Sequence, residues 1–204
     1  MNIAIVDYGL GNIFSVVEAL KTIGFQARLD TDGSQIRGCA IAVIPGVAAF
    51  GAGMSNLAAS GQASAIQDHA RAGGDIVGFC LGAQMLLDSS EETAGVSGLG
   101  LVPGTSIALH RSQCRVPNQG WVATVPADGS TTAWRLESTP HYYYSHSFAM
   151  VVGAGVEQVA FGMTGSAQFL AHYRYGNIQG FQFHPERSGP LGLALLAKIL
   201  TTKE

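Results

Sequence analysis

The sequence is poor in charged residues, and the charges that it has are nearly balanced. Aspartate, glutamate, lysine and arginine make up 12% of the 204 residues, whereas they make up about 25% of an average soluble protein. The formal net charge is −3, so there is no electrostatic reason to expect a nucleic-acid partner. A lightly charged surface is compatible with a protein partner that covers part of it.

Cysteine and long apolar runs are scarce as well. Cys39, Cys80 and Cys114 are too few and too widely spaced for a disulfide framework or a zinc cage. No basic leader precedes the apolar run that starts at Ile3, and no run approaches the roughly 18 residues of a membrane helix. We therefore expect a cytoplasmic, reducing setting, with neither secretion nor membrane insertion.

The sequence also lacks the patterns of a bound cofactor. Gly9 and Gly11 fit the start of a dinucleotide-binding fingerprint, but Phe14 stands where its third glycine would fall. The histidines include no pair with the spacing of a helical metal site. We therefore expect no nucleotide, no metal and no other cofactor.

What the sequence does contain is an alternation of strand-like and helix-like patterns. Hydrophobic residues make up 47% of the chain, enough for the core of one domain spanning residues 1–204. Before Gly95 this alternation predicts an α/β fold with a mostly parallel central sheet. The strands are expected at 3–6, 26–29, 40–44 and 76–79, and the helices from 12 to 24, over 54–59, 63–72 and 83–87, and from Pro190.

After Gly95 the pattern changes to short runs that are rich in aromatic and β-branched residues. Turn residues separate these runs, and no linker or low-complexity segment intervenes. The pattern therefore predicts an antiparallel, β-rich addition within the same domain. Its strands are expected at 105–110, 121–125, 142–150, 156–161, 168–175 and 178–183.

The stretch from Gly78 to Gly82 places Cys80 between a strand pattern and a helix pattern. Its Gly-x-Cys-x-Gly spacing is the thiol counterpart of the serine elbow of hydrolases, in which a strained turn lifts the nucleophile clear of its neighbours. Free N–H groups at a helix start would favour the thiolate, which is the attacking form of cysteine. Many free cysteines are simply small buried core residues, so the elbow alone leaves both interpretations open.

A later stretch supplies a histidine and a carboxylate two positions apart. Pro185 biases His184 towards extended backbone, in which alternate residues point to the same side. His184 and Glu186 are therefore predicted to face the same way, as in a histidine that a carboxylate orients for proton transfer with a thiol. For these two residues alone, the favoured interpretation is a histidine that is hydrogen-bonded at a strand end and a glutamate that is a solvated turn charge.

Taken together, these stretches resemble the class I, triad-type glutamine amidotransferases, and among them the glutaminase subunits of imidazole glycerol phosphate synthases. The resemblance implies a three-layer α/β fold for the whole chain. It is carried by Val6 to Asn12, the loop from Pro45 to Val47, Gly78 to Gln84, Tyr144 to Phe148 and Phe183 to Ser188.

The resemblance implies a role for each residue of the site. Cys80 would attack the side-chain amide of glutamine, His184 would pass the proton to the departing ammonia, and Glu186 would orient His184. Hydrolysis of the thioester would then release glutamate. The backbone N–H groups of Val47 and Leu81 would hold the oxyanion. Glutamine itself would be held by Gly46, Gln84, His146 and Ser147.

The resemblance also implies a partner that consumes the ammonia. The glutaminase would form a heterodimer with a (β/α)8-barrel synthase that makes imidazole glycerol phosphate and AICAR in histidine biosynthesis. Its contact residues would be Asn12, Trp121 and Arg187. The chain departs from the family pattern at Ala48, where a second glycine is usual, and at 118–122. Two alternatives therefore remain, a paralogue that serves another acceptor such as a sugar, and a non-catalytic binding module.

Overall fold

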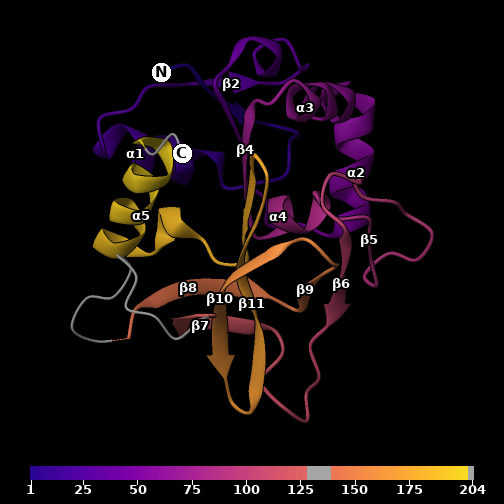
Figure 1. Cartoon of the computed structure of the whole chain (residues 1–204), viewed down its shortest axis with the longest axis vertical. Coiled ribbons are helices and arrows are strands. Elements are labelled where there is room, and N and C mark those ends of the chain that lie inside the picture. Colours follow the sequence, from indigo (N-terminus) through magenta and orange to yellow (C-terminus); the bar gives the residue numbers. More distant parts are fainter. Residues whose placement is uncertain (128–138, 202–204) are drawn as a thin grey trace.

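A computed structural model, which describes residues 1–127 and 139–201, shows a chain folded around one mixed β-sheet (Figure 1). The strand order is β2-β1-β3-β4-β12-β11-β10-β7-β8. From β2 to β12 every neighbouring pair is parallel, which confirms the parallel arrangement predicted before Gly95. The run expected at 178–183 in the antiparallel part instead joins this part as β12, parallel to β4 and antiparallel to β11. The strands of the parallel part are β1 (Ile3–Val6), β2 (Ala27–Asp30), β3 (Ile41–Ile44), β4 (Asp75–Phe79) and β12 (Ile178–Phe181).

Most of the other strands extend the sheet with antiparallel pairings, as the sequence predicts, while the short β5 pairs parallel with β6. The expected strand at 142–150 is in fact two strands, because the chain breaks at Ser147 and pairs with different partners on either side. The last expected run, 178–183, keeps strand geometry only to Phe181. The strands are β5 (Ser89–Ser90), β6 (Gly104–Ala108), β7 (Asn118–Pro126), β8 (His141–His146), β9 (Phe148–Val152), β10 (Glu157–Thr164) and β11 (Ala167–Tyr175).

Helices cover both faces of the parallel part and complete three layers (Figure 1). One face carries α1 (Ile13–Thr22) and α5 (Gly189–Thr201), and the other carries α2 (Phe50–Ala59) and α3 (Gln62–Arg71). Successive strand residues point to opposite faces, so Ile76 and Val77 of β4 belong to separate core clusters, one for each helix layer. None of the helices within the described ranges has the length and hydrophobicity that a membrane crossing requires.

Helix starts show where local sequence signals suffice and where they do not. The predicted cap of α1 is confirmed, since the Asn12 side chain accepts a hydrogen bond from the Ser15 N–H at 3.3 Å. Helix α2 begins at Phe50 rather than at Met54, because the Glu92 carboxylate accepts the Phe50 N–H at 2.7 Å. That cap comes from a distant part of the chain, so the local pattern could not predict it.

The pairing of β4 with β12 brings two distant stretches of sequence to one edge of the sheet. The register places Phe79 beside Phe181 at the carboxyl ends of the two strands. The Cys80 N–H then donates to the Phe181 carbonyl at 2.7 Å. Residues that follow β4 and β12 therefore emerge next to each other, at the edge where open α/β sheets build their sites.

Candidate active site

Cys80 occupies the strained turn that the sequence predicts between strand and helix. Its backbone has φ 50° and ψ −110°, and among the described residues no other non-glycine residue has positive φ. Helix α4 (Leu81–Met85) follows at once, two residues earlier than the pattern indicated. A Cβ atom on Gly78 would collide with the backbone of Ala83, and one on Gly82 would overlap the Ile44 carbonyl. Both glycines are therefore required by the close approach of the backbone.

The Cys80 sulfur is buried but has polar neighbours, unlike a cysteine that merely fills a core. The side chain donates to the Ser145 carbonyl at 3.7 Å and accepts from the Gln182 amide at 3.9 Å. It also lines a cavity with polar walls. This environment favours the functional interpretation of the elbow over the core interpretation.

His184 and Glu186 form a buried pair beside this cysteine. The distance from Nδ1 of His184 to Oε1 of Glu186 is 2.9 Å, and both side chains are 2% exposed, so Glu186 is not the solvated turn charge that was the alternative. A carboxylate can only accept here, so Nδ1 carries the donated proton. Nε2 has no hydrogen-bond partner within the described part of the chain.

The electrostatics of His184 combine opposing effects. Burial lowers its pKa, but the neighbouring Cys80 sulfur and the Glu186 carboxylate outweigh burial and raise the pKa above the ordinary value. The surroundings therefore favour the protonated imidazolium next to the sulfur. That is the arrangement in which a histidine can take up a thiol proton and hold it for a leaving group.

A cavity of about 260 Å³ lies in front of the sulfur, at the carboxyl edge of the sheet. Gly46 packs against its wall, since a Cβ there would overlap the Tyr8 hydroxyl and crowd the Leu81 side chain. The structure thus brings the expected oxyanion donors and the expected glutamine-binding residues to one place. The predicted residues that line the cavity with Cys80 are Val47, Leu81, Gln84, His146 and Ser147.

Gln84 and His146 meet at the carbonyl oxygen of Phe148. The Gln84 amide nitrogen donates to this oxygen at 3.0 Å, and Nδ1 of His146 donates to it at 2.8 Å. Burial lowers the pKa of His146 to about 4, so its ring is neutral and Nε2 accepts from the Asn118 amide at 2.9 Å. His146 therefore holds the loop around Ser147 in place. Its other ring nitrogen is not free for a ligand.

Three residues at the site were not identified from the sequence. Glu92 lines the cavity while capping α2, and nothing in its local sequence marks it as a site residue. Gln182 contacts the sulfur, although it lies next to the histidine motif and had no assigned role. Asn118 belongs to the stretch at which the chain departs from the family pattern, and it is buried and bonds to His146.

Two of the three predicted partner contacts meet on the ring of Tyr143. The Arg187 guanidinium lies 4.2 Å from the ring centroid, and Trp121 packs edge-on at 6.2 Å between centroids. Trp121 is 57% exposed, which is unusual for so large an apolar side chain. Asn12 lies at the start of α1, where its side chain serves as the cap.

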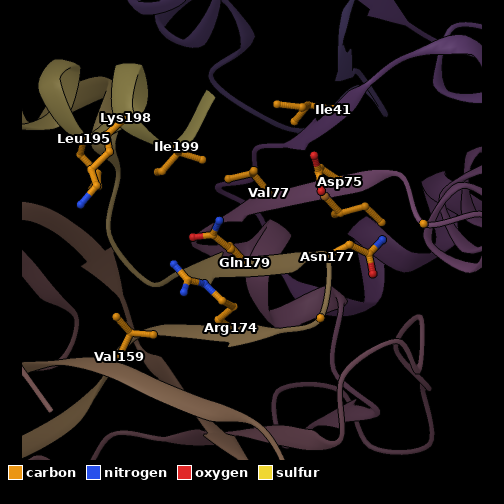
Figure 2. Close-up of a pocket in the computed structure, with 13 residues that line it drawn as sticks. Ile41, Asp75, Val77, Val159, Arg174, Asn177, Gln179, Leu195, Lys198 and Ile199 are labelled. Atoms are coloured by element: carbon orange, nitrogen blue, oxygen red, sulfur yellow. The ribbon is translucent and has the colours of Figure 1, made fainter. Parts of the chain in front are cut away.

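A larger cavity of about 550 Å³ lies elsewhere, at the amino ends of β3, β4 and β12 (Figure 2). Asp75 and Asn177 lie towards one side of it, while Arg174 and Lys198 lie towards the other. No predicted site residue is among its lining residues. The smaller cavity beside Cys80 is therefore the candidate active site.

Comparison with known proteins agrees with this geometry. The family model "Glutamine amidotransferase class-I" matches residues 4–202. The chain belongs to the class I glutamine amidotransferase family. Within that family it is similar to the imidazole glycerol phosphate synthase subunit HisH of Symbiobacterium thermophilum, with 37% identity over 196 residues that cover 96% of this chain and 91% of the relative.

A second relative and a solved structure extend the comparison. The imidazole glycerol phosphate synthase hisHF of Emericella nidulans is 31% identical over 205 residues, which cover 96% of this chain and 37% of that protein. A structure titled "Crystal structure of glutamine amidotransferase" has a TM-score of 0.76 at 18% identity and covers 96% of each chain. This last similarity bears on the fold alone.

Proposed function

We propose that the chain is the glutaminase subunit of an imidazole glycerol phosphate synthase. It hydrolyses glutamine to glutamate and ammonia, and it passes the ammonia to a synthase partner in histidine biosynthesis. The observation that carries the proposal is the meeting of Cys80 with the His184–Glu186 pair beside one cavity. The similarity to proteins named as subunits of that synthase supports the choice of pathway.

The proposed reaction runs through a thioester on Cys80. The thiolate attacks the side-chain carbonyl carbon of glutamine, and the His184 imidazolium gives its Nε2 proton to the departing ammonia. Water then attacks the thioester, His184 accepts a proton from that water, and the sulfur leaves as thiolate. Glu186 holds the imidazole in one tautomer and stabilises its positive charge through both steps.

Two backbone N–H groups are proposed to stabilise the oxyanion, those of Val47 and Leu81. Both residues line the cavity together with Cys80. Leu81 is the first residue of α4, so its N–H has no acceptor within that helix. Removing one such donor typically costs about 10²–10³ in kcat, so the orientation of the Gly46–Val47 peptide controls the rate.

The cavity offers complementary groups for the rest of the glutamine molecule. We assign the α-ammonium group to the carboxylate of Glu92, which is the acidic side chain in the lining. Both N–H bonds of the Gln84 amide are engaged, by Phe148 and Gln182, so its carbonyl oxygen is the atom that remains to accept from the substrate. His146, Ser147 and Gly46 would contribute through backbone groups, since the side chain of His146 is engaged by Asn118 and Phe148.

The ammonia acceptor is proposed to be a (β/α)8-barrel subunit in a heterodimer. The Emericella relative named hisHF extends well beyond the part that matches this chain, which supports a second component acting with the glutaminase. We assign the contact surface to Trp121, Arg187 and Asn12. An exposed tryptophan and a stacked arginine are the residue types that dominate protein interfaces.

A two-part assay tests the proposal. The chain is mixed with the barrel subunit encoded in the same genome, and glutamate release and imidazole glycerol phosphate formation are measured together. We expect glutamine to support the synthase reaction with the wild-type chain but not with Cys80→Ala. A pair that uses free ammonia but gains nothing from glutamine would contradict the proposal, and so would a chain that co-purifies with a sugar-aminating enzyme instead.

A further inference from the structure

Gln182 is a fully buried amide that touches the sulfur of Cys80. It directly follows β12, while Cys80 directly follows the neighbouring strand β4. Its side chain spans the gap between the sulfur, at 3.9 Å from Nε2, and the Gln84 amide, at 3.2 Å from Oε1. A buried amide side chain is costly unless its hydrogen bonds are satisfied, so both contacts matter to its placement.

A chain of fixed groups sets the orientation of this amide. The Phe148 carbonyl can only accept, so it must face the Gln84 amide nitrogen, which lies at 3.0 Å. The same nitrogen then directs its other N–H to Gln182, which must present its carbonyl oxygen there. The Gln182 nitrogen is thereby turned towards Cys80 and presents a donor to the sulfur.

Besides His184, two hydrogen-bonding neighbours of the sulfur favour opposite protonation states. The Ser145 carbonyl, at 3.7 Å, accepts from the S–H and so stabilises the thiol. The Gln182 N–H donates and so stabilises the thiolate, because a hydrogen bond to an ionised acceptor is stronger than one to a neutral acceptor. His184 and Tyr8 are titratable groups beside the sulfur, and Gln182 adds an uncharged side-chain donor that offsets the effect of the carbonyl.

We propose that Gln182 holds the Cys80 sulfur in its attacking position and favours the thiolate, and that the Phe148–Gln84–Gln182 chain links this donor to the glutamine cavity. The inference rests on the proposed function, in which Cys80 is the nucleophile. It adds a residue that acts directly on the nucleophile and is distinct from the acid-base residue His184. Substrate that binds to Gln84 thereby contacts the same chain of hydrogen bonds that orients the donor.

The test measures the alkylation of Cys80 by iodoacetamide as a function of pH, with peptide mass spectrometry to separate it from Cys39 and Cys114. Gln182→Met keeps the length of the side chain and removes the donor. We expect its alkylation profile to move to higher pH by about one unit, which is a tenfold slower reaction at a fixed pH below the midpoint. A profile that coincides with wild type would overturn the proposal.

A matched control separates this effect from general loss of a buried amide. Gln62 is equally buried, and its amide donates to Asp30 and to the Asp7 carbonyl rather than to the sulfur. Gln62→Met should leave the Cys80 profile unchanged, and an equal shift in both variants would overturn the proposal. If Gln182→Met does not fold, Gln182→Glu gives the same information, because it keeps the acceptor for Gln84 and replaces the donor with a negative charge. The alkylation profile of this variant should move to still higher pH, and a profile that coincides with wild type would overturn the proposal.

The experiment also distinguishes this inference from the proposed function. Alkylation needs no glutamine and no partner, so the shift is measurable even when glutaminase activity is absent. Glutamate release by Cys80→Ala would refute the proposed function whatever the alkylation result. The converse pair of results is a normal alkylation profile for Gln182→Met together with loss of glutamate release in Cys80→Ala. This pair would refute only the role of Gln182.

Discussion

The His184–Glu186 pair yields the most sharply defined prediction, through the substitution Glu186→Gln. Gln has nearly the same size and retains an oxygen that can accept from Nδ1, so the packing of the site is preserved. What is lost is the negative charge at 2.9 Å from the imidazole. With that charge removed, only the Cys80 sulfur opposes the effect of burial, so the pKa of His184 should fall.

The expected magnitude follows from the type of bond. A hydrogen bond to a charged group contributes about 1.5–3 kcal/mol, and both partners here are buried at 2% exposure, so solvent screening is weak. At about 1.36 kcal/mol per factor of ten, kcat for glutamine hydrolysis should fall by about 10- to 100-fold. The assay is glutamate release by the chain in complex with its synthase partner, with NMR titration of the His184 ring as the second measurement.

The pH dependence of stability provides an independent check of the same pair. The folded-state pKa of His184 is raised, so its contribution to stability is complete below the unfolded value of about 6.5 and is lost as the pH rises through the folded value. Glu186→Gln should therefore lose less stability than wild type above neutral pH. Glu18→Gln is the control, since Glu18 forms an exposed pair with Lys21. Unchanged kcat and an unchanged His184 titration in Glu186→Gln would refute the reasoning.

Three further changes test other parts of the account. Gly82→Ala places a Cβ on the Ile44 carbonyl, so urea titration should show a loss of about 1–3 kcal/mol, and wild-type stability would contradict the tight turn. Burial lowers the pKa of His172 to about 3, so its contribution to stability is present above pH of about 6.5 and is lost as the pH falls. Between pH 7 and pH 4, the free energy of unfolding of His172→Phe should therefore fall by about 3 kcal/mol less than that of wild type. Equal pH profiles of stability in the two proteins would contradict this role of His172. Trp121→Ala should change the stability of the isolated chain by less than about 0.5 kcal/mol and weaken partner binding by about 2 kcal/mol. An unchanged Kd would remove Trp121 from the interface.

Those parts of the fold with strong local signals were predictable from the sequence. Apolar runs marked β1 and β4, and Asn12 marked the start of α1, because each depends on side chains within a few residues. The strained turn at Cys80 was also predictable, since only the flanking glycines allow the backbone to pass so close to Ile44 and Ala83. His184 and Glu186 do meet as predicted, but only His184 is extended, because Pro185–Arg187 form a short 3-10 helix that carries the Glu186 carboxylate back to the imidazole.

What the sequence could not predict depends on pairings between distant segments. The start of α2 depends on Glu92, which follows a different strand, and the break at Ser147 arises because β8 and β9 pair with different strands. Gln182 reaches the sulfur only because β12 lies beside β4. Asn118 is buried against His146 for a similar reason, since β7 pairs with β8.

The central claim is that glutamine hydrolysis passes through a covalent bond to Cys80. The most direct measurement is mass spectrometry of the chain after acid quenching during turnover of glutamine with the partner present. The account predicts a glutamyl thioester on the peptide that contains Cys80, and no adduct or glutamate release in Cys80→Ala. Sustained glutamate release by Cys80→Ala, or an adduct on Cys39 or Cys114 in its place, would contradict it.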